Sequence, residues 1–358
     1  MIVPSGTDPA NIHRLAEAAR QSYLLHLDGQ EPEPIFLVEP GATRVEDVTP
    51  RPGTAFLLRT SGSTTGTGKL VELPWESILA SGDATNEFLG GPGRWLTSLP
   101  VHHVAGLQTV LRSVAAGLDP LPYSVGAVLP DERVYLSLVP TQLTRALKNE
   151  AVTDQLRSVA AILVGGQATP QALLDAGQEA GLNLVTTYGM TETCGGCVYN
   201  GTPIGNTNAS IENGRIVIES PVVALGYVGG ENFAGRFETS DAGTFTDKLT
   251  VLGRIDDAIT TGGMTIMPAL LEDLVAELFK QTTIATSVPD PEWGERLILV
   301  AEHDLDLELL RSSAKARLGA EYAPKEIRTL RRLGLTSFPL KDSGKIDRRQ
   351  VSRLVKGL

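Results

Sequence analysis

Hydroxyl groups, glycines and a lysine are concentrated in one ten-residue segment, which reads TSGSTTGTGK from Thr60 to Lys69. Glycines let backbone N–H groups approach an anion closely, hydroxyls donate further hydrogen bonds, and a lysine adds positive charge. The segment therefore predicts a loop that binds a polyphosphate, and a flexible surface loop is the alternative. The candidate contacts are Thr60, Ser61, Gly62, Ser63, Thr64, Thr65, Gly66 and Lys69.

A Walker A loop is the obvious rival, but its pattern G-x-x-x-x-G-K-[ST] does not fit. Ser63 stands where the first glycine should be, and Leu70 follows Lys69. Residues 69–73 also look like a strand, whereas a Walker loop opens a helix. The sequence disfavours a P-loop kinase.

Further segments whose residue types could take part in binding or catalysis follow along the chain. They are Gly165-Gly166-Gln167 after an apolar run, Thr187-Tyr188-Gly189-Met190-Thr191-Glu192, Thr239-Ser240-Asp241, Gly253-Arg254-Ile255-Asp256-Asp257, Gly262-Gly263, and Lys345 within a PLKDSGKID segment. A carboxylate with two acceptor oxygens suits a vicinal diol or a hard cation such as Mg²⁺. Each segment alone also fits an ordinary turn or a solvated side chain.

In this order the segments resemble the motifs of the adenylate-forming superfamily, which contains acyl-CoA synthetases, firefly luciferase and peptide-synthetase adenylation domains. The resemblance runs from about residue 56 to the C-terminus. The phosphate loop of that superfamily usually reads T-S-G-[ST]-T-G-x-P-K, so this chain has one extra residue and Gly68 in place of proline. Residues 188–192 match the specific pattern Y-G-x-T-E.

The resemblance implies ATP, Mg²⁺ and coenzyme A as ligands and assigns roles to matching residues. Tyr188 would stack on adenine, Thr191 would bond the α-phosphate, and Glu192 would hold Mg²⁺. The other implied ATP contacts are Gly165, Gly166 and Gln167 at the adenine edge, Thr187 and Gly189 beside the tyrosine, and Asp241 and Arg254 at the ribose.

The C-terminal motifs imply a moving domain. By resemblance, Asp256 is the hinge, Gly262 and Gly263 face coenzyme A after the small domain rotates, and Lys345 serves adenylation. A solvated lysine in a basic tail is the alternative for Lys345, because residues 341–356 hold six basic side chains against two acidic ones.

Two segments, residues 100–106 and 189–199, resemble most the short 2-succinylbenzoate-CoA ligases of menaquinone biosynthesis. That resemblance places His103 at the acyl pocket as a catalytic candidate, and Gly189, Gly195 and Gly196 where an aromatic ring needs room. His102 is the alternative histidine. The acid carries two carboxylates, so a donor or cation for the unreacting one is required, and the sequence does not identify it.

Cys194 and Cys197 form a C-x-x-C pair, which also occurs in redox and zinc sites. No second pair or nearby histidine completes a zinc set in the sequence, and the Y-G-x-T-E motif overlaps the place where a redox helix would begin. Both interpretations are disfavoured.

Other functions remain open at this point. The chain could activate another aryl or fatty acid, could load a carrier protein instead of coenzyme A, or could be a nucleotide-binding regulator without catalysis. Retention of Glu192, Asp241 and Lys345 argues against the regulator.

The elements that must position these residues alternate between strand and helix patterns. Strands are expected at 55–59, 96–99, 134–138, 159–164 and 183–187, and helices at 13–28, 75–89, 105–116, 141–149 and 170–180. This alternation predicts an α/β fold with parallel strands and crossover helices. Short, turn-rich strands after residue 200 (215–220, 250–252) predict a small barrel-like antiparallel part.

A domain boundary is expected near Asp256. It gives an N-terminal adenylate-forming domain of residues 1–255 and a small mobile α+β domain of residues 256–358, with helices at 270–279 and 307–318 and a strand at 297–301.

Composition narrows the class of protein. The 358 residues carry a net charge of −11, which argues against a nucleic-acid binder because phosphate backbones attract basic surfaces. No apolar run approaches the roughly 20 residues needed to cross a bilayer, and the N-terminus lacks a basic region followed by an apolar one. We therefore expect a cytoplasmic enzyme with small-molecule partners and without membrane insertion. A homodimer stays open.

Overall fold

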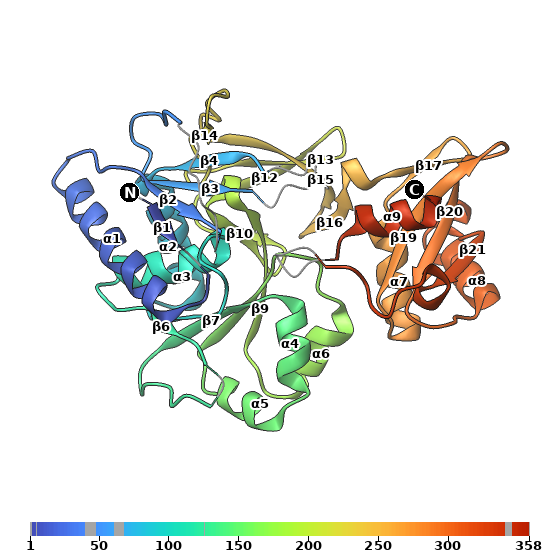
Figure 1. Ribbon diagram of the computed structural model, residues 1–358, viewed down its shortest axis with the longest axis horizontal. Coiled ribbons are helices and arrows are strands. Elements are labelled where there is room, and N and C mark those ends of the chain that lie inside the picture. The colour runs from blue at the N-terminus through green and yellow to red at the C-terminus, as the bar shows by residue number, and fades with distance from the viewer. Residues whose placement is uncertain are drawn as a thin grey trace.

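The computed structural model describes residues 2–4, 6–39, 48–60, 68–124, 126–340 and 346–357. Within these residues the strands form four sheets. Figure 1 shows a large body built from the earlier elements and a smaller one at the other end of the long axis, which holds the last helices and strands.

The first two sheets form the larger body. The first contains, in spatial order, β1 (Ile2–Pro4), β2 (Ile35–Val38), β3 (Phe56–Arg59), β4 (Leu70–Leu73) and β14 (Gly226–Tyr227). The second contains β11 (Thr202–Pro203), β10 (Gly195–Tyr199), β9 (Leu184–Met190), β8 (Ala161–Val164), β7 (Val134–Leu138), β5 (Arg94–Thr97) and β6 (Leu121–Pro122). The run from β9 to β6 is parallel, and β10 and β11 are antiparallel additions.

Helices alternate with the strands of these two sheets, as the pattern predicts. They are α1 (Pro9–Leu27), α2 (Trp75–Leu89), α3 (Val104–Ala115), α4 (Pro140–Leu147), α5 (Glu150–Leu156) and α6 (Gln171–Glu179). Local signals fix their ends: the Asp8 carboxylate accepts a bond from the backbone N–H of Ala10 at 2.8 Å, and Gly90 ends α2 with a φ of 81°. β7 and β8 are buried along their whole length, as expected of central parallel strands.

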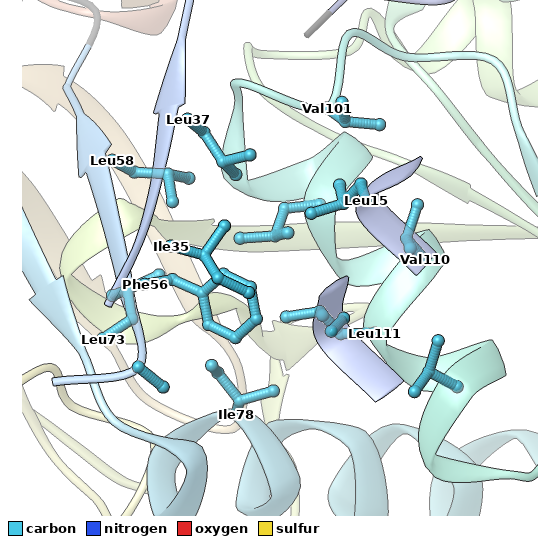
Figure 2. Close-up of a cluster of buried hydrophobic side chains, with 14 of the residues drawn as sticks. Leu15, Ile35, Leu37, Phe56, Leu58, Leu73, Ile78, Val101, Val110 and Leu111 are labelled. Atoms are coloured by element: carbon cyan, nitrogen blue, oxygen red, sulfur yellow. The ribbon is translucent and has the colours of Figure 1, made fainter. Parts of the chain in front are cut away.

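A core between the first sheet and α1, α2 and α3 holds the larger body together. Figure 2 shows the side chains of this cluster converging from these elements. The labelled members are Leu15, Ile35, Leu37, Phe56, Leu58, Leu73, Ile78, Val101, Val110 and Leu111. The Phe56 ring meets Trp75 edge-on at 5.3 Å, and full burial of such a side chain stabilises the fold by about 1.5–3 kcal/mol. This core fixes β3 and β4, the strands on either side of the predicted phosphate loop.

The third sheet is antiparallel and contains β12 (Asn208–Glu212), β13 (Arg215–Glu219), β15 (Arg236–Phe245) and β16 (Leu249–Arg254). The sequence predicts this small antiparallel part. Short 3₁₀ segments, η1 (Thr191–Thr193) and η2 (Ile255–Asp257), follow β9 and β16.

The fourth sheet is made from later residues alone. It contains β18 (Met264–Ile266), β17 (Ile259–Thr261), β20 (Gly294–Ala301), β19 (Thr283–Asp290) and β21 (Glu326–Thr329), and it is accompanied by α7 (Pro268–Phe279), α8 (Leu307–Arg317), η3 (Ala320–Tyr322), η4 (Leu330–Leu333) and α9 (Arg348–Lys356).

Alternate residues of β20 point to opposite faces of the fourth sheet. Leu297 and Leu299 pack with side chains of α7 and α8, and Ile298 packs with Val351 and Val355 of α9. The buried members of these two clusters all lie after residue 258, which supports the boundary predicted near Asp256; the boundary itself stays a prediction.

The α/β architecture is confirmed, while some elements were not predicted. The sequence pattern did not indicate β1 and β2, and it treated residues 346–357 as part of a basic tail. In the structure two valines on one face of α9 are buried. None of the described helices is long and apolar enough to cross a membrane.

Candidate active site

The carboxyl ends of β8 and β9 bring the predicted adenine-edge loop beside the Y-G-x-T-E motif. A Cβ atom on Gly165 would lie 2.2 Å from the hydroxyl of Thr187, so only glycine fits this approach. Gly166 has a φ of 82°, a left-handed conformation that glycine adopts without strain. Gln167 follows in the same bend. The loop and motif therefore meet as predicted.

Tyr188 and Asp241 are 53 residues apart and share a hydrogen bond. The Tyr188 hydroxyl donates to Oδ2 of Asp241 at 2.9 Å, and Nη1 of Arg254 lies 3.8 Å from Oδ1 of the same carboxylate. Burial and the Asp241 charge raise the pKa of Tyr188, so the hydroxyl stays protonated and donates. The predicted adenine residue and both predicted ribose residues thus form one cluster, positioned by the pairing of β15 with β16.

Glu192 lies in η1 within reach of groups from β14 and from the end of the phosphate loop. The hydroxyl of Tyr227 donates to its Oε1 at 2.8 Å. Burial raises the pKa of Glu192, while the bond from Tyr227 and the charges of Lys69 and Arg254 act to lower it. Thr191 begins the same 3₁₀ segment, and its carbonyl accepts a bond from the N–H of Cys194 at 3.1 Å.

Thr60 and Lys69 form the described ends of the phosphate loop and pair with each other. The N–H of Thr60 donates to the carbonyl of Lys69 at 2.8 Å, and the N–H of Lys69 donates to the Thr60 hydroxyl at 2.9 Å. The Lys69 ammonium lies 4.4 Å from the centre of the Tyr227 ring. The chain therefore enters and leaves the predicted loop at one point near Glu192.

A single carboxylate fits the way proteins hold Mg²⁺ on a nucleotide. Among the described residues there is no group of three or more His, Cys, Asp or Glu side chains that could form a metal cage. Mg²⁺ retains several waters and commonly binds one or two carboxylates together with substrate phosphates. Glu192, with Oε1 bonded to Tyr227, suits this mode.

The glycines of the predicted acyl pocket lie on β9 and β10, and the start of α3 approaches β10. A Cβ on Gly189 would lie 1.9 Å from the carbonyl oxygen of Gly195 on the facing strand. A Cβ atom on Gly195 would lie 3.4 Å from the Gln108 side chain and 4.0 Å from the Val104 side chain. A Cβ atom on Gly196 would lie 2.8 Å from the Tyr199 ring. The glycines therefore allow backbone and helix to approach closely.

His102 and His103 lie together at the start of α3. His103 is the N-cap residue, and its ring centre lies 4.4 Å from that of His102. Burial lowers the pKa of His102, whose Nδ1 is buried without a hydrogen-bond partner among the described residues. Because Val104 contacts the Gly195 position, both histidines are near the predicted pocket, and the geometry leaves both as candidates.

Arg112 is a candidate that sequence reasoning missed. It lies on α3, is 6% exposed, and makes no ion pair with any described carboxylate. Its Nη2 donates to the Ser81 hydroxyl at 3.4 Å, its guanidinium packs on the Trp95 ring at 4.9 Å, and its Nε has no partner among the described residues. A buried charge without a counter-ion is costly, which indicates an anionic ligand.

Arg112 is linked to the acyl pocket through neutral groups. The Ser81 hydroxyl donates to the carbonyl of Cys194 at 3.3 Å, and Nε2 of Gln108 donates to the same carbonyl at 2.6 Å. Cys194 directly precedes Gly195. The spacing of Gln108 and Arg112, one helical turn apart on α3, is the sequence signal that could have pointed to this polar face.

The two cysteines belong to the core. Both are free and buried, and burial raises the pKa of Cys194 and raises that of Cys197 to about 12. A reactive cysteine needs a lowered pKa and access to solvent. The structure therefore argues against a redox pair.

Other predicted residues lie elsewhere or outside the described part of the chain. Gly262 and Gly263 form the turn between β17 and β18, with φ of 57° and 78°, in the smaller body and away from β9 in Figure 1. Asp256 lies in η2, where its carboxylate accepts a bond from Arg254 at 2.9 Å. Ser61, Gly62, Ser63, Thr64, Thr65, Gly66 and Lys345 lie outside the described residues.

Comparison with known proteins gives consistent results. A family model described as "AMP-binding enzyme" matches residues 3–228. The chain is 37% identical to a probable 2-succinylbenzoate–CoA ligase of Mycobacterium tuberculosis (strain CDC 1551 / Oshkosh), over 85% of each chain. It is 32% identical to the 2-succinylbenzoate–CoA ligase of Lactococcus lactis (strain IL1403), over 83% of this chain and 70% of that one.

A solved structure has the same fold. It is the o-succinylbenzoate CoA synthetase of Bacillus subtilis in complex with its acyl-adenylate intermediate, with a TM-score of 0.71 and 25% identity. The match covers 93% of this chain and 80% of that one.

Proposed function

This chain belongs to the family of AMP-binding enzymes, and from that premise we propose that it is an AMP-forming ligase that joins 2-succinylbenzoate to coenzyme A in menaquinone biosynthesis. The observation that supports the proposal is the cluster of Tyr188, Asp241 and Arg254, which lies with Glu192 beside the close approach of β9, β10 and α3. This cluster supports binding of a nucleotide next to the proposed acyl site.

In the first step, a carboxylate oxygen of the acid attacks the α-phosphorus of ATP. The bond from this phosphorus to the oxygen that bridges the β-phosphorus breaks, and pyrophosphate leaves with that electron pair. No general base is needed because a carboxylate is already ionised near pH 7. The obstacle is repulsion between negative charges, so the charges of Lys69, Arg254 and the proposed Lys345 would stabilise the step.

Glu192 would hold Mg²⁺, which when bound would supply positive charge to offset the negative charge of the phosphates. The protein contributes the orientation of this carboxylate. Thr191 would donate its hydroxyl to the α-phosphate, while Tyr188 would stack on adenine and Asp241 would accept bonds from the ribose hydroxyls.

In the second step, the coenzyme A thiolate attacks the acyl carbon of the adenylate. The bond from the acyl carbon to the AMP oxygen breaks, AMP leaves, and the thiol proton passes to solvent. We propose that the part after Asp256 rotates between the steps, so that Gly262 and Gly263 replace Lys345 at the site. His103 would line the acyl pocket.

The unreacting carboxylate of the substrate needs a buried positive partner, and Arg112 is proposed for this role. A guanidinium has donors arranged as a fork that matches a carboxylate, and the Nε–H of Arg112 is available. Gln108, on the same face of α3, is 2% exposed, and its Oε1 has no hydrogen-bond partner among the described residues.

The function is tested by pyrophosphate release from ATP and Mg²⁺ with 2-succinylbenzoate, benzoate and a medium-chain fatty acid, each with and without coenzyme A. The proposal expects turnover with 2-succinylbenzoate and coenzyme A alone. Turnover with another acid alone would support an AMP-forming ligase but would assign it to a pathway other than menaquinone biosynthesis. Turnover without any need for free coenzyme A would favour transfer to a carrier protein. Absence of pyrophosphate release with every acid would favour a nucleotide-binding regulator without catalysis.

Two further proposals concern the protein in the cell. A cytoplasmic location is tested by cell fractionation, and a homodimer is tested by sedimentation equilibrium. The location rests on the sequence, and the homodimer is an alternative that the sequence leaves open.

A further inference from the structure

The side chain of Tyr227 touches two groups of the nucleotide site that come from distant parts of the chain. Its hydroxyl donates to Oε1 of Glu192 at 2.8 Å, and its ring face lies 4.4 Å from the ammonium of Lys69. Glu192 follows β9, whereas Lys69 ends the predicted phosphate loop. Tyr227 therefore links the proposed metal ligand to the proposed phosphate cation.

Several contacts hold Tyr227 in this position. β14 pairs with β4, with Tyr227 opposite Val71, and Nη1 of Arg51 donates to the carbonyl of Tyr227 at 3.1 Å. Arg51 also makes an ion pair with Glu72, which is fully buried in β4. The Phe233 ring packs edge-on against the tyrosine ring at 5.0 Å. The ring is thus fixed from its backbone and from its side.

The backbone of Glu192 is tied to the same segment. Its carbonyl accepts a bond from the N–H of Ala224 at 2.9 Å, three residues before Tyr227. The carboxylate and the hydroxyl that bonds it are therefore placed by one connected piece of structure.

We infer that Tyr227 is a positioning residue for the metal–nucleotide complex, in that its hydroxyl fixes one oxygen of Glu192 and its ring holds the Lys69 ammonium. The hydroxyl engages Oε1, so the carboxylate would face the metal in a defined direction. Without the hydroxyl the carboxylate could rotate, and a rotating ligand binds a metal less well. This inference rests on the ATP-dependent function proposed above.

The test measures ATP binding by titration calorimetry in the absence of acid and coenzyme A, with Mg²⁺ or with EDTA. Tyr227→Phe removes the hydroxyl and keeps the ring. We expect it to weaken binding of ATP with Mg²⁺ about five- to tenfold and to leave binding in EDTA unchanged, because a hydrogen bond to a charged group is lost only from the metal ligand. Tyr227→Leu, which also removes the ring from Lys69, should weaken binding in EDTA too.

Tyr123→Phe is the matched control. Its hydroxyl bonds Oε1 of Gln155 at 3.3 Å, and Tyr123 follows β6, the edge strand of the second sheet opposite β11, so ATP binding should not change. Melting temperatures of all variants report whether they fold.

A double-variant cycle tests whether Tyr227 acts through Glu192. In a Glu192→Gln background, Tyr227→Phe should cause no further loss of Mg²⁺-dependent affinity. An equal loss from Tyr227→Phe with Mg²⁺ and with EDTA, or full additivity in the cycle, would overturn the inference.

Failure of this inference differs from failure of the proposed function. A wild-type protein that binds ATP with Mg²⁺ but converts no 2-succinylbenzoate contradicts the function and leaves the role of Tyr227 to be decided by the cycle. A wild-type protein that converts the acid while Tyr227→Phe binds ATP normally contradicts the inference alone.

Discussion

At the scale of single residues, Arg112 has a defined consequence for substrate selection. Arg112→Met keeps much of the side-chain volume and removes the charge. We expect kcat/KM for 2-succinylbenzoate to fall about 100-fold, in line with about 2–3 kcal/mol for a charge-assisted pair, while the KM for ATP stays the same. Steady-state rates with each substrate varied give both numbers.

Substrate analogues that each lack one carboxylate provide the control for Arg112. The analogue that keeps the reacting carboxylate should be a poor substrate of the wild type and should be affected little by Arg112→Met. If the variant loses the same factor on the analogue as on 2-succinylbenzoate, Arg112 does not bind the second carboxylate. Arg112→Lys keeps the charge but loses the forked arrangement of donors. Its kcat/KM for 2-succinylbenzoate should lie between those of the wild type and Arg112→Met.

Single residues also show what a sequence can and cannot reveal about a site. Tyr188, Glu192 and Asp241 stand in segments that resemble the motifs of a known superfamily, and this resemblance was enough to propose them. Tyr227 and Arg112 contact partners that are far away in the sequence. Tyr227 bonds Glu192, 35 residues before it. Arg112 bonds Ser81, whose hydroxyl bonds the Cys194 carbonyl. Such partnerships depend on strand pairing and helix packing, which spacing does not encode.

At the scale of elements, the hairpin of β9 and β10 depends on glycine. Gly189→Ala would put a methyl carbon against the carbonyl of Gly195 on the facing strand, at a separation of 1.9 Å before any shift. Because the hindering atom belongs to the backbone, the strands must move apart. We expect adenylation to fall at least 100-fold, measured as pyrophosphate exchange, with a lower melting temperature.

Gly82→Ala is a matched control on α2, because the added methyl would meet only the Arg112 side chain at an ordinary 3.8 Å. It should keep the activity and gain up to about 1 kcal/mol of stability from the better helix propensity of alanine. Normal activity in Gly189→Ala would contradict the close approach of β9 and β10.

Asp273 on α7 gives a pH-dependent prediction for an element of the smaller body. It lines a cleft of about 400 Å³ between α7 and residues 169–172. Although part of its surface is exposed, burial and the neighbouring Glu272 carboxylate raise its pKa to about 6. A raised pKa means that the folded state favours the protonated acid, so stability is lost as pH rises from about 4 through 6.

Asp273→Asn removes this penalty. Its melting temperature should exceed that of the wild type at pH 8 and equal it at pH 4, with a gain below about 1 kcal/mol because solvent screens the exposed part. Asp304→Asn, an exposed change between β20 and α8, is the control. A lower melting temperature of Asp273→Asn at pH 8 would show that the charge is stabilising instead.

The elements themselves were partly predictable. Apolar runs and helical spacing predicted the parallel strands of the second sheet and their crossover helices, because these segments are long, buried and regular. β1 and β2 are short strands near the N-terminus; β1 pairs with β2, and β2 pairs with β3, so their existence depends on partners elsewhere. Most side chains of α9 are polar or basic, so the sequence indicated a solvated tail. In the structure, Val351 and Val355 pack against the fourth sheet and so fix the position of α9.

At the scale of the whole molecule, one substitution should block the first half-reaction and leave the second intact. Lys345→Ala is expected to block adenylate formation about 100-fold or more and to spare thioester formation from supplied acyl-adenylate, because the proposed rotation would bring different residues of the smaller body to the site in the two steps. Single-turnover assays of each half-reaction measure the two rates. Equal loss of both would contradict the proposed role of Lys345 and the exchange of residues by rotation.

The most direct test of the whole account is a staged single turnover followed by mass spectrometry. Enzyme, ATP, Mg²⁺ and 2-succinylbenzoate are mixed first, and coenzyme A is added afterwards. The account predicts that an acyl-adenylate of 2-succinylbenzoate accumulates on the enzyme, and that coenzyme A then converts it to the thioester with one AMP released for each thioester formed. Absence of the adenylate together with release of ADP, or an adenylate that coenzyme A does not consume, would contradict it.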